Sequence, residues 1–475
     1  MRSVRRLWLT VSVALITILG AVAPVVVSSA NATTAVTATT FWNNTKVHTV
    51  AITMAKADIT KVITDYRASQ TKTWVKATIT LDGRTFSNVG MRLKGNSSLR
   101  SVSTSATAQS LPWLVRLDKY TKTQNLNGMT SFVIRSNTTA TSLNEAIALN
   151  LIGAAGLETQ RAIATKLTVN GSKPALRLVI DNMDDYYYTR VFKNAGILYK
   201  ADAQGDYSYR GDTATAYTDV FDQETSKDHE NFSPLTTFLK FVNQATDAEF
   251  AAQLPNYLDI NKFAKYLAVM SLIDNFDDIE GPGNNSYLQY DQTTGKMTVV
   301  AWDENLAFGQ TPQAGGFGNL QRDQFNPGGA MPQLGQFDTR TAQGGFPRGQ
   351  QFDTRTAQGG LVPLPVGAPD TSTALGALPG GQIPQGALQQ FGNRAGGGRG
   401  MSGNNILTTR FRANTAFAKL ITDATATLKA KLYTSGYANT VLTKWEKLLK
   451  AQASTVVTTS KIASETAAIR TYFTK

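Results

Sequence analysis

Residues 274–309 of this chain read DNFDDIEGPGNNSYLQYDQTTGKMTVVAWDENLAFG, and their order decides how the fold is interpreted. The stretch begins with three carboxylates, Asp274, Asp277 and Asp278, and continues with a pair of Asn residues. Two apolar runs separated by turn-forming residues follow, and the second run ends directly at Asp303. Carboxylate and amide oxygens are the ligands that hard cations such as Mg²⁺ prefer, so the pattern favours magnesium over zinc.

The two apolar runs predict a β-hairpin. Residues 286–290 and 297–302 are aromatic and β-branched, and residues 291–295 between them are rich in turn formers. Antiparallel pairing would bring Asn285 and Asp303 to neighbouring ends of two strands. Protein kinases use the same order: a catalytic-loop Asp, a metal-binding Asn, a hairpin and a metal-binding Asp. The stretch therefore has the layout of a phosphoryl-transfer centre.

Composition limits the chemistry that is available. The 475 residues are 42% hydrophobic, enough for one large core or two lobes. Cysteine is absent, which excludes disulfides, thiolate metal sites and cysteine catalysis. His48 and His229 are the only histidines, too few for a histidine-rich zinc site. The formal charge of +13 favours anionic partners such as nucleotide, cell-wall polymer or lipid headgroups. Nucleic acid is not expected, because the basic residues are spread along the chain without a compact basic-aromatic block.

The N-terminus has the features of an export signal. Three arginines precede an apolar stretch from Leu7 to about Val27, and Ala30-Asn31-Ala32 offers a small-residue cleavage pattern. The alternative is an uncleaved N-terminal anchor, because the apolar stretch approaches spanning length. No later segment is long and apolar enough to cross a membrane. We therefore expect no membrane span in the mature chain, and a protein that is secreted or held at the cell surface.

Periodicity predicts an α+β fold of two lobes, a β-rich N-lobe and a mainly helical C-lobe. The expected strands alternate or are β-branched, and the expected helices carry apolar residues at helical spacing. The strands are predicted at residues 72–81, 90–93, 113–117, 131–135, 166–169 and 175–180, and the helices at 142–155, with Ser142 as N-cap, and at 259–273. The expected domain divisions are 1–32 signal peptide, 33–70 leader and N-terminal segment, 71–195 N-lobe, 196–309 C-lobe, 310–404 insertion and 405–475 C-terminal helices with a break at Ser435-Gly436.

The insertion is rich in Gly, Pro and Gln and contains a ten-residue direct repeat, at 336–345 and at 351–360. Such a composition cannot bury enough apolar surface to offset its ordering entropy, so we expect disorder. Each repeat places two threonines around an arginine. Because the insertion follows Phe308-Gly309 directly, these threonines are candidate autophosphorylation sites, and a passive spacer is the alternative; they are Thr339, Thr341, Thr354 and Thr356.

Several motifs together resemble the spore-coat protein H (CotH) kinase family. They are Met91-Arg92-Leu93-Lys94-Gly95-Asn96-Ser97-Ser98, the Leu143-Asn144-Glu145 helix, Gly196-Ile197-Leu198-Tyr199-Lys200, and Trp302-Asp303 with Phe308-Gly309. The resemblance covers roughly residues 75–310 and resumes in the terminal helices. It implies an atypical secreted protein kinase that uses ATP and Mg²⁺ or Mn²⁺ to phosphorylate Ser or Thr hydroxyls of a protein substrate.

The resemblance also assigns roles to residues of the 274–309 stretch. Asp277 matches the catalytic-loop Asp, because Asn275-Phe276-Asp277 fits an Asn-Leu-Asp pattern, and Asp274 and Asp278 are alternatives. Asn285 matches the Asn of a His-Asn-Tyr run, although Asn284 replaces the His. Asp303 matches the metal-binding Asp, and an acid directly after an apolar run is hard to explain as solvated surface.

Further matches concern the nucleotide. Glu145 matches the helix Glu that pairs with a phosphate-gripping cation. Where relatives carry a Lys before an aromatic residue, this chain has Leu111-Pro112-Trp113, so Lys94 and Arg116 are the candidate cations. Asn96 belongs to a possible phosphate-covering loop that could equally be a simple turn. Asp181 stands where relatives usually show Glu. A non-catalytic surface protein that binds anionic wall polymer is the competing interpretation, and it predicts no metal-dependent nucleotide binding.

Overall fold

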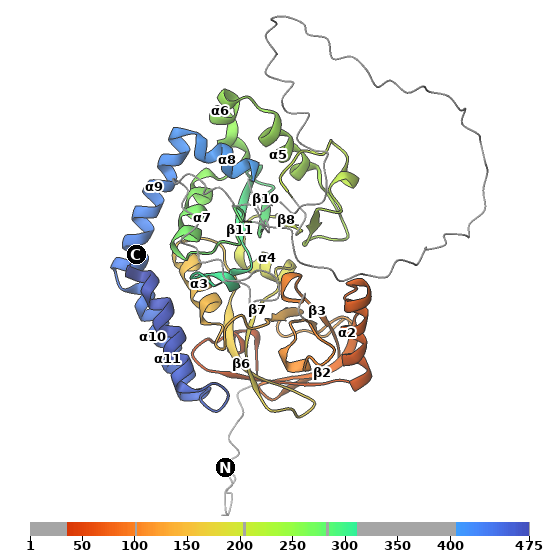
Figure 1. The fold of residues 1–475 in the computed structure, drawn as a ribbon. Helices are drawn as coiled ribbons and strands as arrows, with labels where there is room; N and C mark the ends of the chain where they lie inside the picture. Colours follow the sequence, from red (N-terminus) through yellow and green to blue (C-terminus); the bar gives the residue numbers. More distant parts are fainter. Residues whose placement is uncertain (1–35, 100–101, 203–205, 282–284, 311–404, 475) are drawn as a thin grey trace, which may run out of the picture. The chain divides into compact units, whose positions relative to one another are not determined.

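The computed structural model describes residues 36–99, 102–202, 206–281, 285–310 and 405–474. The fold is of mixed α and β structure, as the sequence predicts, with two sheets and eleven α-helices among these residues (Figure 1). The expected signal peptide and the repeats of the insertion lie outside the described residues. No helix in the described ranges is long and apolar enough to span a bilayer.

The first sheet is a closed barrel of seven strands in the order β1-β2-β3-β4-β5-β7-β6, where the sequence predicted only a β-rich lobe. β1 closes it, pairing antiparallel with β2 and parallel with β6. The strands are β1 His48–Thr53, β2 Val75–Leu81, β3 Arg84–Leu93, β4 Trp113–Arg116, β5 Ser131–Ile134, β6 Ala162–Val169 and β7 Ala175–Asp181. β1 precedes residue 71, where the sequence analysis began the β-rich part.

A two-residue turn joins β2 to β3. Asp82 and Gly83 have positive φ angles of 45° and 94°, the left-handed conformation at both central positions that a type I′ hairpin requires. Residues 84–89, which lie outside the strands predicted from the sequence, are therefore part of β3. The strand runs continuously to Leu93.

The second sheet has the order β11-β10-β8-β9 and contains the predicted hairpin. Its strands are β8 Gly196–Ala201, β9 Phe221–Gln223, β10 Ser286–Asp291 and β11 Lys296–Ala301. β10 and β11 pair antiparallel with Ser286 opposite Ala301. The predicted hairpin is confirmed to within one residue at each strand end.

Helices contribute most of the larger core. They are α1 Ala38–Phe41, α2 Lys56–Ser69, α3 Leu143–Ala154, α4 Asp185–Val191, α5 Ser233–Gln244, α6 Asp247–Tyr257, α7 Ile260–Leu272, α8 Ile406–Ala413, α9 Thr415–Lys429, α10 Tyr437–Gln452 and α11 Thr459–Arg470. α3 and α7 confirm the two predicted helices. Gly436, with φ +77°, separates α9 from α10 at the expected break, after a π-helical turn at Ala430–Thr434. Ser142 does occupy the N-cap position of α3, but in a left-handed conformation without a side-chain cap.

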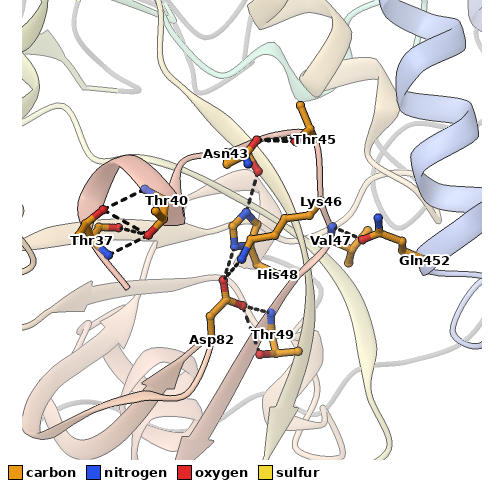
Figure 2. A network of polar contacts seen from close by, with 10 residues as sticks. All are labelled: Thr37, Thr40, Asn43, Thr45, Lys46, Val47, His48, Thr49, Asp82 and Gln452. Carbon is orange, nitrogen blue, oxygen red and sulfur yellow. Dashed lines mark hydrogen bonds and ion pairs between the residues drawn. The ribbon is translucent and has the colours of Figure 1, made fainter. Parts of the chain in front are cut away.

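A polar network fixes β1 to its neighbours (Figure 2). Asp82 accepts from the backbone N–H of Thr49 at 2.8 Å, and its other oxygen lies 2.6 Å from Nδ1 of the buried His48 and 2.9 Å from Nζ of Lys46. Nε2 of His48 donates to the carbonyl of Asn43 at 2.7 Å. One turn carboxylate therefore holds the start of the barrel's closing strand.

Candidate active site

A buried arginine connects the barrel, helix α3 and the end of the hairpin. Arg135 follows the last residue of β5, and its Nε lies 2.9 Å from Oε1 of Glu145 in the first turn of α3. Its Nη2 contacts Oδ1 of Asp303, which follows β11. Arg135 and Glu145 are 8% and 2% exposed, so this ion network is shielded from solvent screening. Burial alone would lower the pKa of Arg135, but the carboxylates of Asp303 and Glu145 raise it above its usual value.

The hairpin brings Asn285 and Asp303 to one end of the second sheet. Ser286 pairs with Ala301, so the residues just before β10 and just after β11 leave the sheet at the same edge. Nδ2 of Asn285 donates to the backbone carbonyl of Asp277 at 3.0 Å. This bond orients the Asn285 amide and attaches the carboxylate-rich loop to the hairpin end.

Asp303 stands at a sharp change of backbone direction. Its φ of 66° is left-handed, and a short 3₁₀ turn, Glu304–Leu306, follows. The side chain of Asn144, next to Glu145 on α3, donates to the carbonyl of Asn305. The helix that carries Glu145 is therefore bound directly to the segment that carries Asp303.

Glu304 supports this turn from inside the core. It is 1% exposed, and burial raises the pKa of its carboxyl well above the usual value. Nδ2 of Asn275 donates to Oε2 of Glu304 at 2.7 Å, while Oε1 has no hydrogen-bond partner in the described structure. Glu304 thus joins the loop after α7 to the segment after β11.

The three loop carboxylates differ in exposure. Asp274 and Asp277 are partly exposed, whereas Asp278 is 6% exposed, and burial raises its pKa to about 7. The backbone N–H of Gly309 donates to the carbonyl of Asp274 at 3.2 Å, which ties the loop to the Phe308-Gly309 motif. Asp274 and Asp277 are consequently better placed than Asp278 to meet a substrate hydroxyl.

Lys94 lies beyond the end of β3, with Nζ 5.2 Å from the ring centroid of Trp302. Trp302 immediately precedes Asp303, so Lys94 faces the same region as the ion network. Burial lowers the pKa of Lys94 to about 8; Glu224 opposes this shift, and nearby cations such as Lys200 add to it. A lysine with this pKa loses a large part of its charge between pH 7 and pH 9.

The other two predicted nucleotide contacts are placed differently. Arg116 forms a two-bond pair with Asp118, at 3.0 and 2.8 Å, and its side chain is 41% exposed. The structure thus pairs Glu145 with Arg135, and Arg116 with Asp118. Asn96 is exposed in the loop after β3, next to Gly95, whose φ of +122° favours glycine.

Sequence reasoning missed Arg135. A signal was present: the apolar run Phe132-Val133-Ile134 ends in a cation, ten residues before a helix that carries Glu145. The candidate cations were sought only around the glycine-containing loop and the strand after it. The pairing itself joins residues 168 positions apart and becomes visible only in the folded chain.

The donor set fits a divalent cation bound partly by its substrate. Asp303 supplies a carboxylate that is 24% exposed, and Asn285 supplies an amide whose nitrogen is already engaged. No group of three or more His, Asp or Glu side chains that could hold a metal occurs among the described residues. Mg²⁺ is commonly held by one or two carboxylates together with substrate phosphates, so a single carboxylate and an amide are sufficient protein ligands.

Comparison with known proteins identifies the family to which the chain is similar. The family model described as CotH kinase protein matches residues 91–347, more than half of the chain. Inner spore coat protein H of Bacillus subtilis (strain 168) is 22% identical over 169 residues, which cover 34% of this chain and 46% of that protein. The match therefore spans about half the length of this curated relative.

Proposed function

We propose, from the premise that this chain belongs to the CotH kinase protein family, that it is an exported atypical protein kinase. It would transfer the γ-phosphate of ATP to Ser or Thr hydroxyls of a protein substrate, with Mg²⁺ or Mn²⁺ as cofactor. The relative's name places that relative in the inner spore coat. Together with the N-terminal pattern of residues 1–32, this supports a location outside the cytoplasm, secreted or at the cell surface.

The observation that carries the proposal is the pairing of Arg135 with Glu145 and Asp303. In protein kinases, a strand lysine pairs with a glutamate of the following helix, and a separate aspartate after a hairpin holds Mg²⁺. Here Arg135 directly follows β5, the next helix carries Glu145, and β11 ends before Asp303. The barrel and the second sheet correspond in this interpretation to the two lobes of a kinase-like fold.

Each residue then has a chemical task. Asp277, with Asp274 as the alternative, orients the substrate hydroxyl and accepts its proton. Arg135 and Lys94 attract the nucleotide phosphates and stabilise the charge that develops on them. Asp303 and Asn285 would hold the divalent ion, which neutralises charge on the β- and γ-phosphates when bound. Glu145 keeps the Arg135 guanidinium in position.

Incubation of the purified protein with radiolabelled ATP and Mg²⁺ or Mn²⁺ tests the proposal. We expect label on protein, and its loss in Asp303→Asn, which keeps the shape of the side chain but removes its charge. Asp219→Asn is the matched control, because Asp219 is exposed in the turn before β9, outside the elements that carry Arg135, Glu145 and Asp303. Undiminished labelling by a folded Asp303→Asn protein would refute the mechanism. Absence of metal-dependent nucleotide binding in the unsubstituted protein would instead support a non-catalytic binding protein.

A further inference from the structure

The positive charge of the folded chain is concentrated in its C-terminal helices. Residues 36–310 contain 27 Lys or Arg and 27 Asp or Glu residues, so this segment is formally neutral. Residues 405–475 contain 11 Lys or Arg residues and three Asp or Glu residues. Basic residues occur along the whole sequence, but of these two parts only the C-terminal helices contain more basic than acidic residues. The elements α8–α11 therefore form a cationic region beside a neutral body.

The acids of this region neutralise only some of its cations. Asp423, Glu446 and Glu465 are each paired with a lysine four positions away on the same helix, at 2.7, 2.6 and 3.3 Å. Four other lysines are exposed and form no ion pair with any residue that the structure describes: Lys429, Lys431, Lys444 and Lys447. We call these four residues the α9–α10 lysine surface.

The elements that carry this surface are well anchored. The opposite face of α10 is buried in the main core, with Leu442 and Leu449 fully buried. Lys444 and Lys447 are three residues apart and share the outer face of the helix. In the π-helical turn that carries Lys431, the hydroxyl of Tyr433 donates to the carbonyl of Leu272 at 2.6 Å. Leu272 ends α7, two residues before Asp274, so the lysine surface belongs to the same folded unit as the candidate site.

The chemistry of the surface selects its partner. Lysine ammonium groups are flexible point charges, without the planar fork that makes arginine selective for one bidentate geometry. Tyr437 is the one large apolar side chain of α8–α11 that is exposed in the described structure. Insertion into a membrane surface would require several exposed apolar side chains on one helix face, and without them lysines give only a salt-sensitive attraction to anionic headgroups. The features present suit a flexible soluble chain with regularly repeated negative charges.

We propose that the α9–α10 lysine surface binds a polyanion whose repeat unit carries a phosphate group. Counterion release from such a polymer provides the affinity, which consequently depends strongly on salt. The bound polymer would hold the protein in place through helices α9 and α10, while the groups around Asp303 stay free for their own ligand. The inference does not depend on the proposed phosphoryl transfer.

The test compares two fourfold lysine-to-glutamine variants of the full chain. One replaces Lys429, Lys431, Lys444 and Lys447. The control replaces four exposed lysines of the neutral body, Lys56, Lys122, Lys173 and Lys193, and so removes the same charge. The probe is fluorescently labelled long-chain inorganic polyphosphate, and its binding is measured by anisotropy over a range of salt concentrations.

We expect the unsubstituted protein and the control to bind polyphosphate with similar affinity. The surface variant should bind at least ~10-fold more weakly at low salt, and its log–log salt slope should be smaller by about 3, since each lost phosphate contact contributes roughly 0.7 for single-stranded polyanions. A variant with arginine at the same four positions should bind as tightly as the unsubstituted protein. The unfolding temperatures of all variants should remain unchanged, because the substituted side chains are exposed.

Three outcomes would overturn the proposal. The unsubstituted protein could fail to bind polyphosphate, or the control could lose as much affinity as the surface variant, which would show a general charge effect. Tighter binding to phosphatidylglycerol vesicles or to polyglutamate than to polyphosphate would indicate a membrane or an acidic protein as the partner.

Discussion

At the residue scale, the main finding is a buried arginine that pairs with the glutamate of α3, a partner for which the sequence suggested Lys94 or Arg116. Arg135 reaches two carboxylates at once, Glu145 through Nε and Asp303 through Nη2. A lysine ammonium is a single point charge and cannot reproduce this two-sided geometry. The guanidinium therefore fixes the distance between α3 and the segment after β11, in addition to supplying charge.

Arg135→Lys should keep the fold but reduce phosphoryl transfer by roughly 10- to 100-fold, because charge is retained while the bridging geometry is lost. Arg135→Ala should in addition destabilise the protein by about 3–5 kcal/mol, since Glu145 would be buried without its cation. Label incorporation and thermal unfolding measure the two effects. Arg116→Lys is the control, because Arg116 pairs with Asp118 at the surface. Equal losses in both lysine variants would argue against a special role for Arg135.

The lowered pKa of Lys94 leads us to expect that nucleotide binding depends on pH. Its pKa of about 8 means that it is mostly charged at pH 7 and mostly neutral at pH 9. If the ammonium attracts phosphate, the Kd for a non-hydrolysable ATP analogue with Mg²⁺ should rise by ~10-fold from pH 7 to pH 9. Calorimetric titration at both pH values provides the measurement.

Lys94→Arg should flatten this profile, because arginine stays charged over the whole range. Lys200→Arg, which alters a nearby lysine paired with Asp202, should leave the profile unchanged. A profile that persists in Lys94→Arg would assign the titration to another group.

At the element scale, the turn between β2 and β3 does more than reverse the chain. Asp82 receives bonds from three residues at the start of β1, as Figure 2 shows. Val47, also at this start, donates to the side chain of Gln452 at the end of α10 at 2.8 Å. Closure of the barrel and attachment of the C-terminal helices thus meet at one strand end.

Asp82→Asn should lower the free energy of unfolding at pH 7 by about 2 kcal/mol, the size of a hydrogen bond to a charged group. Although burial alone would raise the pKa of Asp82, bonds from His48, Thr49 and Lys46 hold it well below the usual value. A carboxyl with a lowered folded pKa stabilises fully above its unfolded pKa of about 3.9, and this contribution disappears as the pH falls further.

Urea unfolding at pH 7 and pH 3 should therefore show a difference between the unsubstituted protein and Asp82→Asn that shrinks in acid. Asp423→Asn, in an exposed pair with Lys419, should cost less than about 1 kcal/mol at either pH. A constant difference for Asp82→Asn would mean that its charge is not what stabilises the turn.

At the scale of the whole molecule, the described segments on both sides of the insertion are bonded to the loop that carries the candidate catalytic aspartates. Before the insertion, the Gly309 N–H bonds to the Asp274 carbonyl, and after it, Arg412 forms a two-bond pair with Glu280 at 2.5 and 2.6 Å. The described core is assembled from residues on either side of the insertion. The contacts that hold the core together on both sides of the insertion are therefore made by residues outside it.

Deletion of residues 312–402 should leave a folded protein that binds nucleotide and unfolds at an unchanged temperature, because the contacts that close the core lie outside the deleted segment. Thermal unfolding and nucleotide titration check this expectation. Loss of solubility or of cooperative unfolding would show that the segment is part of the fold.

The threonines of the repeats lead to a separate expectation. If the insertion is as flexible as its composition predicts, tethering raises local concentration to roughly millimolar, and Thr339, Thr341, Thr354 and Thr356 should become phosphorylated in cis. Peptide mass spectrometry after incubation with ATP decides, with the Asp303→Asn protein as control. Unmodified 336–360 peptides from an active preparation would favour a passive spacer.

The sequence by itself determined the elements whose signals are local. The β10–β11 hairpin follows from two apolar runs and a turn, α3 and α7 from helical periodicity, and the break at Gly436 from glycine. The sequence also predicts that Asn285 and Asp303 lie at neighbouring strand ends, because the register of a hairpin is set by residues close together in the chain. The Asp82-Gly83 turn has an equally local signal, because Asp-Gly is a preferred pair for a type I′ hairpin.

Only the tertiary structure decided the features that join distant segments. The parallel pairing of β1 with β6, which closes the barrel, and the contact of Arg135 with Asp303 link residues more than one hundred positions apart. A local pattern shows that a strand or a cation is present, but not which partner it meets. That choice depends on how all the apolar faces are buried at once, because ion pairs and strand edges gain their energy only where folding brings them together.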